Sequence, residues 1–459
     1  MLLLAAPNPN AANGGQETAP ASQSPQPASE PSSSTSEPAT EVASTSAAEQ
    51  PASERGGASL KIQIGLAFFA FFLFGANDAI VGVLLPSLQG YYNVDKATLG
   101  IIFISGSIGY LLAVFNTGFL APKLGNTRVL ALGAASFASG GLAFGLQPPF
   151  FAIAIAPLLL GFGAAIVEAG LNSHLAKLPT KTALLNYLHA FFGLGALIGP
   201  VAASGMLWAG WGWNSIYFWL AGMTLILLPG FLWAFRADPS DAGDGAETDS
   251  EGGRNRIRQA LQYRVVWLVA VFLLFYVGTE LTLGNWSYSF LTEARNEDGF
   301  LAGWLVSGYW LGLTVGRVVL ARLSARIGDK WLIQGGLLGT VSGVAVLWSA
   351  PNSAVAGMGL LLTGFSLSPI LPTAVAFMSN LIPTRVLMSA ISLLGSLSSI
   401  GKALFPWLAG NLAEGIGLAF LPHYVTVLVA SMAIFWTILT LWAQRALASE
   451  PAVQEASEA

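Results

Sequence analysis

The second half of this chain repeats the glycine pattern of its first half at an offset of roughly 200 residues. Seven glycines of the window 75–162 coincide with glycines of the window 278–365, where chance predicts about two coincidences. The coinciding pairs are Gly75 and Gly278, Gly100 and Gly303, Gly109 and Gly312, Gly125 and Gly328, Gly133 and Gly336, Gly140 and Gly343, and Gly161 and Gly364. A repeat of this length predicts two copies of one structural unit.

The composition is typical of a chain embedded in lipid. Of the 459 residues, 54% are hydrophobic and 10% are charged, and the mean hydropathy is +0.63. A soluble domain usually carries about 25% charged residues. We therefore expect an integral membrane protein surrounded by the lipid bilayer. The net charge of −4 argues against a nucleic-acid partner.

The sequence offers no motif for a cofactor, a metal or a catalytic centre. It contains no cysteine, and its three histidines, His174, His189 and His423, lie far apart in the chain. Disulfides and thiolate metal sites are therefore excluded. We find no phosphate-binding glycine loop and no nucleophile motif, so we expect no metal, no cofactor and no enzymatic activity.

Twelve segments are long and apolar enough to cross a bilayer as helices, which takes about 20 residues each. They are 62–88, 98–121, 127–147, 150–173, 183–208, 213–235, 264–290, 300–322, 331–349, 353–378, 386–411 and 419–444. The sequence thus predicts an all-α membrane protein, with twelve transmembrane helices in two pseudo-symmetric six-helix bundles. Repeats of this kind are typical of secondary transporters, which bind a small-molecule substrate at the seam between the repeats.

The domain boundaries follow from the same pattern. We expect an N-terminal bundle at 59–235, a polar cytoplasmic loop at 236–263, a C-terminal bundle at 264–445 and a short tail at 446–459. Residues 1–58 are rich in Ala, Ser, Pro and Glu and contain no aromatic residue. Such a segment cannot bury enough apolar surface to fold, so we expect a disordered tail, with a phosphorylated regulatory tail as the alternative.

Positive charge indicates the orientation in the membrane. Sixteen of the 20 Lys and Arg residues fall on one side of the predicted spans, and Lys and Arg are enriched in cytoplasmic loops. We therefore expect both termini to be cytoplasmic in a multi-pass protein. We further expect it to be a monomer of the plasma membrane.

Arg317 lies within a predicted span, and five further titratable residues in the spans stand out, because charge there is costly and usually functional. They are Asp78, Glu168, His189, Glu280 and Lys402. Glu168 is the main candidate for proton coupling, because burial disfavours its charged form and favours proton uptake. We expect His189 or Asp78 to assist it. The alternative for each is a purely structural role, as a buried hydrogen-bonded group that holds neighbouring helices together.

Substrate-binding candidates come from both repeats. Asn172 follows Glu168 by four residues and therefore shares its helical face. Asn77 falls at the repeat position of Glu280, so both halves place a polar group at one depth. The segment from Glu280 to Asn285 and Trp286 combines an acid, an amide and an aromatic ring, which suits a sugar or polyol. Interfacial packing is the alternative for this segment.

Lys402 also belongs to the predicted substrate site. A lysine inside a span needs a carboxylate partner, an anionic substrate or neutralisation. Its partner is Glu280, Asp78 or Glu168, and the sequence leaves all three open. Two prolines, Pro369 and Pro372, are expected to break the helix 353–378.

Several motifs together resemble a known family. They are GANDAIVGVLLPSLQGYY (75–92), GFGAAIVEAGLNSHL (161–175), LHAFFGLGALIGP (188–200), YVGTELTLGNW (276–286) and YWLGLTVGRVVL (309–320). In this order and spacing they look like the fucose-permease-like branch of the major facilitator superfamily, and most like its fungal members. The basic loop at 122–128, repeated at Arg326, Gly328 and Lys330, resembles the superfamily's loop motif.

The resemblance implies proton-coupled symport of a sugar-like solute. The family's pattern of an acid followed four residues later by Asn matches Glu168 and Asn172, and that acid is implicated in proton coupling. The family's first-helix Asp position falls on Gly82 here, one turn from Asp78. Fungal relatives include exporters, so the alternative is a proton antiporter that exports an organic acid or another small metabolite. A third alternative is a nutrient sensor that transports nothing.

Overall fold

The computed structural model describes residues 53–178, 180–235 and 250–458, and every regular element in these ranges is helical. The N-terminal half contains α1 (Ser53–Tyr92), α2 (Lys96–Leu99), α3 (Ile101–Leu124), α4 (Asn126–Gly145), α5 (Phe150–Ile153), α6 (Ile155–Ala176), α7 (Lys181–Trp208) and α8 (Trp213–Ala234). After α9 (Ser250–Ala260) follow α10 (Arg264–Ser289), a π-helical turn (Phe290–Ala294), α11 (Gly299–Ile327), α12 (Asp329–Ser349), α13 (Ser353–Leu367), α14 (Ile370–Ser379), α15 (Thr384–Ile416), a 3₁₀ turn (Leu418–Phe420) and α16 (Leu421–Glu458).

Twelve stretches of these helices are long and apolar enough to cross a membrane, as the sequence predicts. Three differences concern the expected tails and loop. Helix α1 begins inside the range predicted as a tail, α16 continues through 446–458, and α9 lies in the predicted polar loop. A helix satisfies its own backbone hydrogen bonds, so it can continue beyond the apolar stretch that defines a span. The predicted disorder of residues 1–52 lies outside the described part of the chain.

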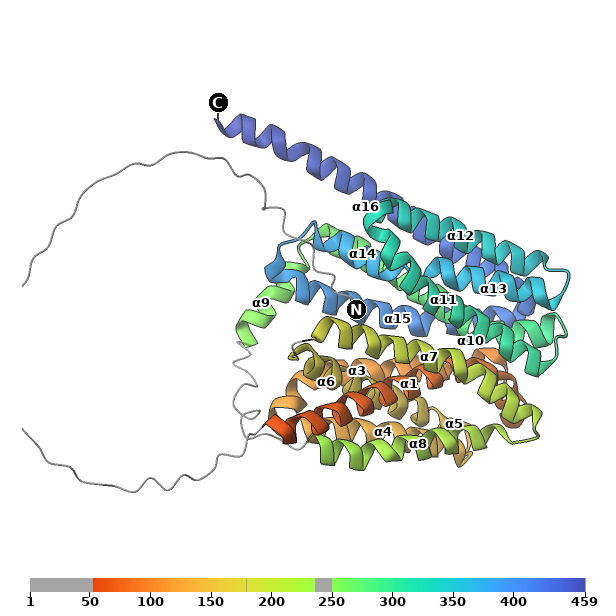
Figure 1. Cartoon of the computed structure of the whole chain (residues 1–459). Helices are drawn as coiled ribbons and strands as arrows, with labels where there is room; N and C mark the ends of the chain where they lie inside the picture. The colour runs from red at the N-terminus through yellow and green to blue at the C-terminus, as the bar shows by residue number, and fades with distance from the viewer. Residues whose placement is uncertain (1–52, 179, 236–249, 459) are drawn as a thin grey trace, which may run out of the picture.

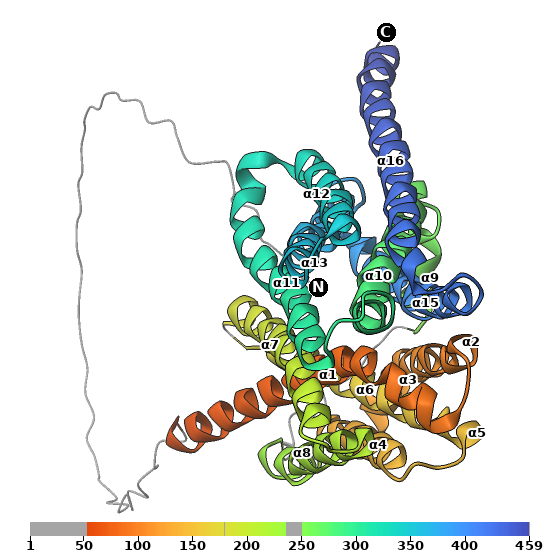
Figure 2. The same cartoon turned by 90° about the vertical axis from the view of Figure 1, so that its right-hand side faces the viewer.

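The helices pack as two bundles with the same internal arrangement (Figures 1 and 2). In the N-terminal bundle α1 packs on α7, α3 and α4 pack on α6, and α4 packs on α8. In the C-terminal bundle the same pairings recur as α10 on α15, α11 and α12 on α13, and α12 on α16. The bundles meet where α1 contacts α10, α7 contacts α11, and α3 contacts α15. The repeat in the sequence is therefore a repeat of packing.

The coincident glycines lie at points where two helices approach closely. A Cβ added at Gly109 would lie 2.0 Å from the Leu158 carbonyl oxygen, and one at Gly312 would lie 2.1 Å from the Leu361 carbonyl oxygen. Gly161 and Gly364 occupy the partner helices of the same two crossings. Small residues let helix backbones come together, and van der Waals contact then holds them in lipid. These positions are restricted to glycine by space.

At one repeated pair of positions, glycine is favoured by the backbone conformation rather than by a lack of space. Gly125 precedes α4 with φ of 76°, and Gly328 precedes α12 with φ of 81°. Nothing lies within 4 Å of a Cβ added at either position. The left-handed backbone, which L side chains rarely adopt, is what favours glycine in these two tight connections.

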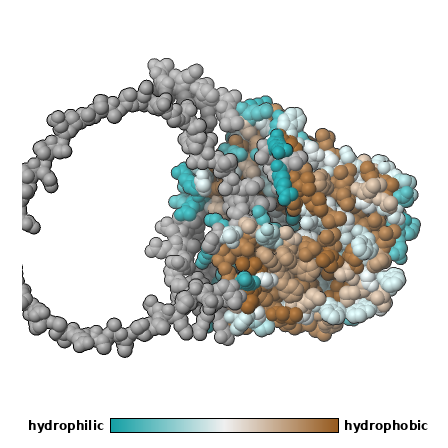
Figure 3. All heavy atoms as spheres, viewed as in Figure 1, coloured by the Kyte–Doolittle hydropathy of each residue, from teal (hydrophilic) through white to brown (hydrophobic). Residues whose placement is uncertain are grey.

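The tenth predicted span is broken, as its prolines indicate. Helix α13 ends at Leu367, and α14 begins at Ile370 after Pro369. The Ser368 hydroxyl donates to the Phe365 carbonyl oxygen at 2.7 Å, so the break satisfies one freed acceptor locally. Across the face shown in Figure 3, apolar residues cover most of the surface and hydrophilic residues gather toward its edges.

The glycine crossings predict a strong position dependence of stability. We expect Gly312→Ala to lower the free energy of unfolding by about 1–3 kcal/mol, because the new methyl group overlaps a backbone carbonyl that cannot move alone. Thermal unfolding in detergent measures the effect. Gly335→Ala is the matched control, since nothing lies within 4 Å of its added Cβ. Equal stability of the two variants would contradict the steric explanation.

Candidate functional site

An ion pair joins the two bundles in the interior of the molecule. The Nζ of Lys402 on α15 lies 2.7 Å from the Oδ2 of Asp78 on α1. The structure thus selects Asp78 among the three partners that the sequence leaves open for Lys402. Because the two residues are 324 positions apart, the contact depends on the docking of one bundle against the other.

This pair remains partly accessible. The exposed fraction is 36% for the Lys402 side chain and 27% for that of Asp78. Gly395 and Ser392 lie on the same face of α15 at helical spacing, both are exposed, and a Cβ added at Gly395 meets nothing within 4 Å. Met388, one turn further along this face, is 59% exposed. Met388, Ser392 and Gly395 are therefore exposed positions in the part of α15 toward the end of the molecule that holds α9, whereas Ser398 and Ser399, one turn before Lys402, are buried.

At the opposite end the bundles are in close contact. The Lys96 Nζ lies 2.9 Å from Glu293 Oε2, and the Lys96 backbone N–H donates to Glu414 Oε2 at 3.0 Å. A Cβ added at Gly410 would lie 2.8 Å from the Lys96 carbonyl oxygen, and one at Gly82 would lie 2.7 Å from the Gly284 carbonyl oxygen. We call Lys96, Glu293, Glu414 and Gly410 the closed-end cluster. The structure is closed at this end.

Glu168 lies beside the central ion pair without a base of its own. Its Oε2 accepts a long hydrogen bond of 3.4 Å from the Tyr110 hydroxyl. The charges of Asp78 and Lys402 are near enough to act on it. Within the described ranges Glu168 forms no ion pair. Asn172 is half-buried one turn further along α6, on the same face.

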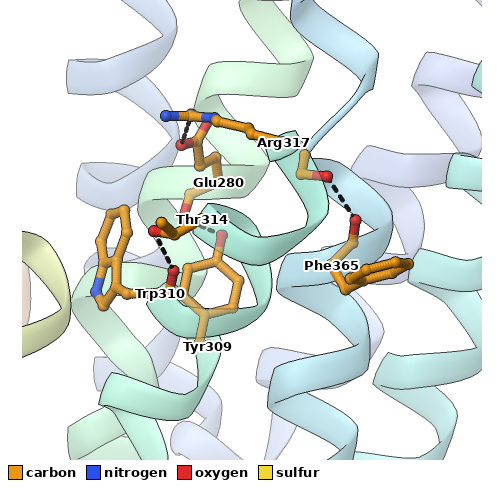
Figure 4. A network of polar contacts seen from close by, with 7 residues as sticks. Glu280, Tyr309, Trp310, Thr314, Arg317 and Phe365 are labelled. Atoms are coloured by element: carbon orange, nitrogen blue, oxygen red, sulfur yellow. Dashed lines mark hydrogen bonds and ion pairs between the residues drawn. The ribbon is translucent and has the colours of Figure 1, made fainter. Parts of the chain in front are cut away.

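A second ion pair lies wholly inside the C-terminal bundle (Figure 4). The Arg317 guanidinium on α11 lies 3.3 Å from Glu280 Oε1 on α10, and the Arg317 side chain is 33% exposed. The Tyr309 hydroxyl donates to the Glu280 backbone carbonyl at 2.9 Å, and the Tyr276 hydroxyl lies beside both charged groups. Arg317 is expected within a span from the sequence, but it is not among the expected site residues. The cost of a charge in a span was the signal that could have identified it.

The two ion pairs and Glu168 form one electrostatic group. The charges of Asp78, Glu168 and Glu280 all act on Lys402. The group contains three acids and two bases, so it carries one excess negative charge when every member is ionised. A single proton neutralises it. Since Asp78 and Glu280 each have a base in contact, Glu168 is the acid whose charge is least compensated.

His189 on α7 and Asn77 on α1 belong to the N-terminal bundle. The His189 ring packs edge-on against Phe71 on α1, with 5.5 Å between the ring centroids, and the charge of Arg317 is near enough to act on it. Asn77 is buried, and its Oδ1 has no hydrogen-bond partner among the described residues. A buried carbonyl of this kind is an available acceptor for a hydroxyl or a proton-bearing group.

Asn285 and Trp286, two predicted substrate-binding residues, lie closer to the closed end. The Trp286 indole N–H donates to the Pro406 carbonyl oxygen at 2.9 Å, and its ring lies against Gly410. The Asn285 amide donates to the Leu281 carbonyl oxygen of its own helix at 2.8 Å. In this conformation these donors are used within the protein, while Asp78, Lys402, Glu168 and Glu280 come together. Direct substrate contact by Asn285 and Trp286 stays a prediction.

The described residues contain no cluster of three or more potential metal ligands. What the site brings together instead is accessible, opposite charge contributed by two symmetric bundles of membrane-spanning helices. This arrangement defines a membrane transporter of the two-bundle class, in which the solute binds at the seam between repeats.

The comparison with protein families specifies the class further. The model of the Major Facilitator Superfamily matches residues 67–300 and 276–459, and the chain belongs to this family. The protein is therefore a multi-pass membrane transporter of small solutes and not an enzyme. The predicted fold and superfamily are confirmed. The fucose-permease-like branch and the fungal type stay predictions.

Two curated relatives span most of the chain. "Bypass of stop codon protein 6" of Saccharomyces cerevisiae is 24% identical over 414 residues, which covers 83% of this chain and 82% of the relative. The 3-(3-hydroxy-phenyl)propionate transporter of Escherichia coli K12 is 26% identical over 393 residues, covering 82% and 93% respectively. Among solved structures, a D-xylose-proton symporter superposes with a TM-score of 0.69 at 15% identity, covering 82% of this chain and 97% of that one. At this identity the superposition shows the fold.

The central ion pair predicts energetic coupling between Asp78 and Lys402. A double-mutant cycle of Asp78→Asn and Lys402→Gln tests this coupling. We expect the double variant to lose about 1 kcal/mol less free energy of unfolding than the sum of the losses of the two single variants. Each single variant leaves one charge uncompensated, and partial exposure moderates its cost. Chemical denaturation in detergent measures the cycle. The control pairs Asp78→Asn with Lys330→Gln, two positions with no contact and no expected coupling; zero coupling in both cycles would refute the interaction.

Proposed function

We propose that this protein is a secondary active transporter that moves a small solute by proton-coupled alternating access. The observation that carries the proposal is the Asp78–Lys402 pair across the seam, with Glu168 beside it as an acid without a base. Opening and closing of the seam changes the surroundings of all three groups. Proton binding and bundle movement are therefore coupled by the same contacts.

Glu168 is the proposed proton carrier, and Asp78 is its helper. When Glu168 is ionised, the electrostatic group holds an excess negative charge in a region of low dielectric, which favours uptake of a proton. The Tyr110 hydroxyl can donate to the carboxylate and can accept from the protonated acid. His189 is near enough to Arg317 for that charge to act on it, and it is proposed as a secondary proton site.

The first candidate solute is sugar-like. The sequence motifs imply it, and the fold of the D-xylose-proton symporter is compatible with it. Glu280, Asn77 and Asn172 supply acceptors and donors of the kind that bind hydroxyl groups. One observation favours a second candidate, an organic acid. The ammonium of Lys402 is partly exposed, and it would attract a carboxylate, whereas binding of a neutral solute requires no cation.

The proposed orientation places both termini in the cytoplasm, according to the distribution of Lys and Arg. In Figure 1 the start of α1, helix α9 and the end of α16 lie toward the same end of the molecule. With this end cytoplasmic, the closed-end cluster is on the outer side and the conformation faces inward. We propose the plasma membrane as its location and the monomer as its working form.

Glu168→Gln tests the coupling. In proteoliposomes we expect the variant to lose solute-driven proton flux, by about tenfold or more, because an amide cannot carry a proton through the cycle. Solute binding should persist. A pH-sensitive dye inside the vesicles measures the flux. The control is Glu297→Gln, which removes an acid bonded to Ser353 away from the electrostatic group. Undiminished proton flux in the Glu168 variant would remove this residue from the mechanism.

Gly410→Val tests alternating access. The larger side chain overlaps the Lys96 carbonyl and the Trp286 ring, so the closed end should open and the opposite end should close. We expect a severalfold slower reaction of an impermeant maleimide with Ser392→Cys, because this face of α15 becomes covered. The chain has no native cysteine, so labelling is specific.

Gly415→Val is the control for this labelling experiment. Gly415 lies on the same helix, and nothing is within 4 Å of its added Cβ. The control should label like the parent Ser392→Cys protein. If Gly410→Val and Gly415→Val label at the same rate as the parent, the closed-end cluster does not control which side is open.

A further inference from the structure

We propose that the transported solute carries a carboxylate, which replaces Asp78 as the partner of Lys402 while Asp78 shares a proton with Glu168. This inference rests on the proposed function and deepens it, because it names the solute class and the place of the proton. The observations behind it are the geometry of the Lys402–Asp78 pair, its exposure, and the position of the unpaired third acid.

Transport of a neutral solute would not explain why a lysine, whose charge is costly within a span, is present at position 402. An ammonium inside a span must be compensated at every stage of transport. If Asp78 takes up a proton, Lys402 loses its contact partner, and the nearest remaining acids are Glu168 and Glu280. Glu280 is already in contact with Arg317. A carboxylate on the solute supplies the missing negative charge at the point where it is lost.

The structure provides access to the ammonium. More than a third of the Lys402 side chain is exposed, although its Nζ is in contact with Asp78 across the seam. Gly395 and Ser392, about two and three turns before Lys402 on α15, are exposed as well, although Ser398 and Ser399 between them and Lys402 are buried. A solute that enters from this end of α15 meets the cation before it reaches the closed end. Exchange of one carboxylate for another on Lys402 then needs no large rearrangement of the helix.

The release of Asp78 from Lys402 accounts for the proton that is taken up together with the solute. Once Asp78 leaves Lys402, its charge and that of Glu168 act on each other with no opposite charge in contact with either, which favours the binding of one proton by the two acids. The groups that act on this pair are Lys402 from α15 and Tyr110 from α3, and Glu280 from α10 acts on Lys402 in turn. One anion and one proton enter together, so the formal charge of the group is unchanged. Transport is then electroneutral, with one proton for each carboxylate.

Matched pairs of probes test the solute class on purified, full-length protein. Each pair contains an acid and a neutral analogue of similar size: gluconate with glucose, lactate with glycerol, and benzoate with benzyl alcohol. We expect a rise in the unfolding temperature with at least one acid and with no neutral analogue, because selective binding stabilises the folded state. The rise should be larger at mildly acidic than at mildly alkaline pH, since binding takes up a proton.

Substitutions at Lys402 complete the test. Lys402→Gln should abolish the stabilisation by the acid, and Lys402→Arg should retain it. The double variant Asp78→Asn with Lys402→Gln removes both charges and leaves none uncompensated, so it keeps a folded reference that should not respond to the acid. The proposal is overturned if no acid stabilises the protein, if a neutral analogue does so equally, or if Lys402→Gln responds like the parent.

A transport assay separates this inference from the proposed function. In proteoliposomes, proton flux driven by a neutral analogue and unaffected by Lys402→Gln would support proton coupling and overturn the carboxylate. Carboxylate-selective, Lys402-dependent stabilisation without any proton flux would support the carboxylate and overturn proton coupling. Acid uptake with proton flux, at a rate unchanged by an imposed membrane potential, is the result expected when both hold.

Discussion

The cost of placing charge in lipid is the constraint on which the rest of this structure depends. An ionised side chain within a span must find an opposite charge, and here Lys402 makes its contact with one across the seam, at Asp78. The two bundles are therefore held together by a contact that a proton or a competing anion can break. Within the C-terminal bundle, the Glu280–Arg317 pair places further charge near the seam. Function and architecture use the same electrostatic group.

The repeated glycines explain how the helices within each bundle are packed rigidly. Gly109, Gly161 and their counterparts Gly312 and Gly364 bring helix backbones into contact inside each bundle. These contacts are the same in both halves and involve no charge. The seam is different, because it combines close backbone approaches such as that at Gly82 with charged contacts such as those of Lys402 and Lys96. Alternating access requires rigid bundles and a seam whose contacts can be broken and re-formed.

Much of the fold could be predicted from the sequence, since long apolar runs and a glycine repeat are local signals. Glu168 and its neighbour Asn172 could be placed on one face for the same reason. The partner of Lys402 could not be predicted, because Asp78 is 324 residues away and the contact depends on how the bundles dock. The packing of Trp286 against Gly410 likewise could not be predicted, because it depends on how α10 and α15 cross inside the C-terminal bundle. Arg317 was visible as a charge in a span, but only its contact with Glu280 shows what it does.

The contact of Lys96 with two acids of the other bundle has a consequence for the surrounding medium. Glu293 is 37% exposed, and its ion pair with Lys96 lies at the end of the molecule that would face outward in the proposed orientation. Mobile ions weaken attractions between exposed charges, with a range of about 8 Å at physiological ionic strength. In the proposed orientation, the balance between the two conformations of alternating access would depend on the ionic strength outside the cell. Dilute surroundings strengthen the outer contact, and saline ones loosen it.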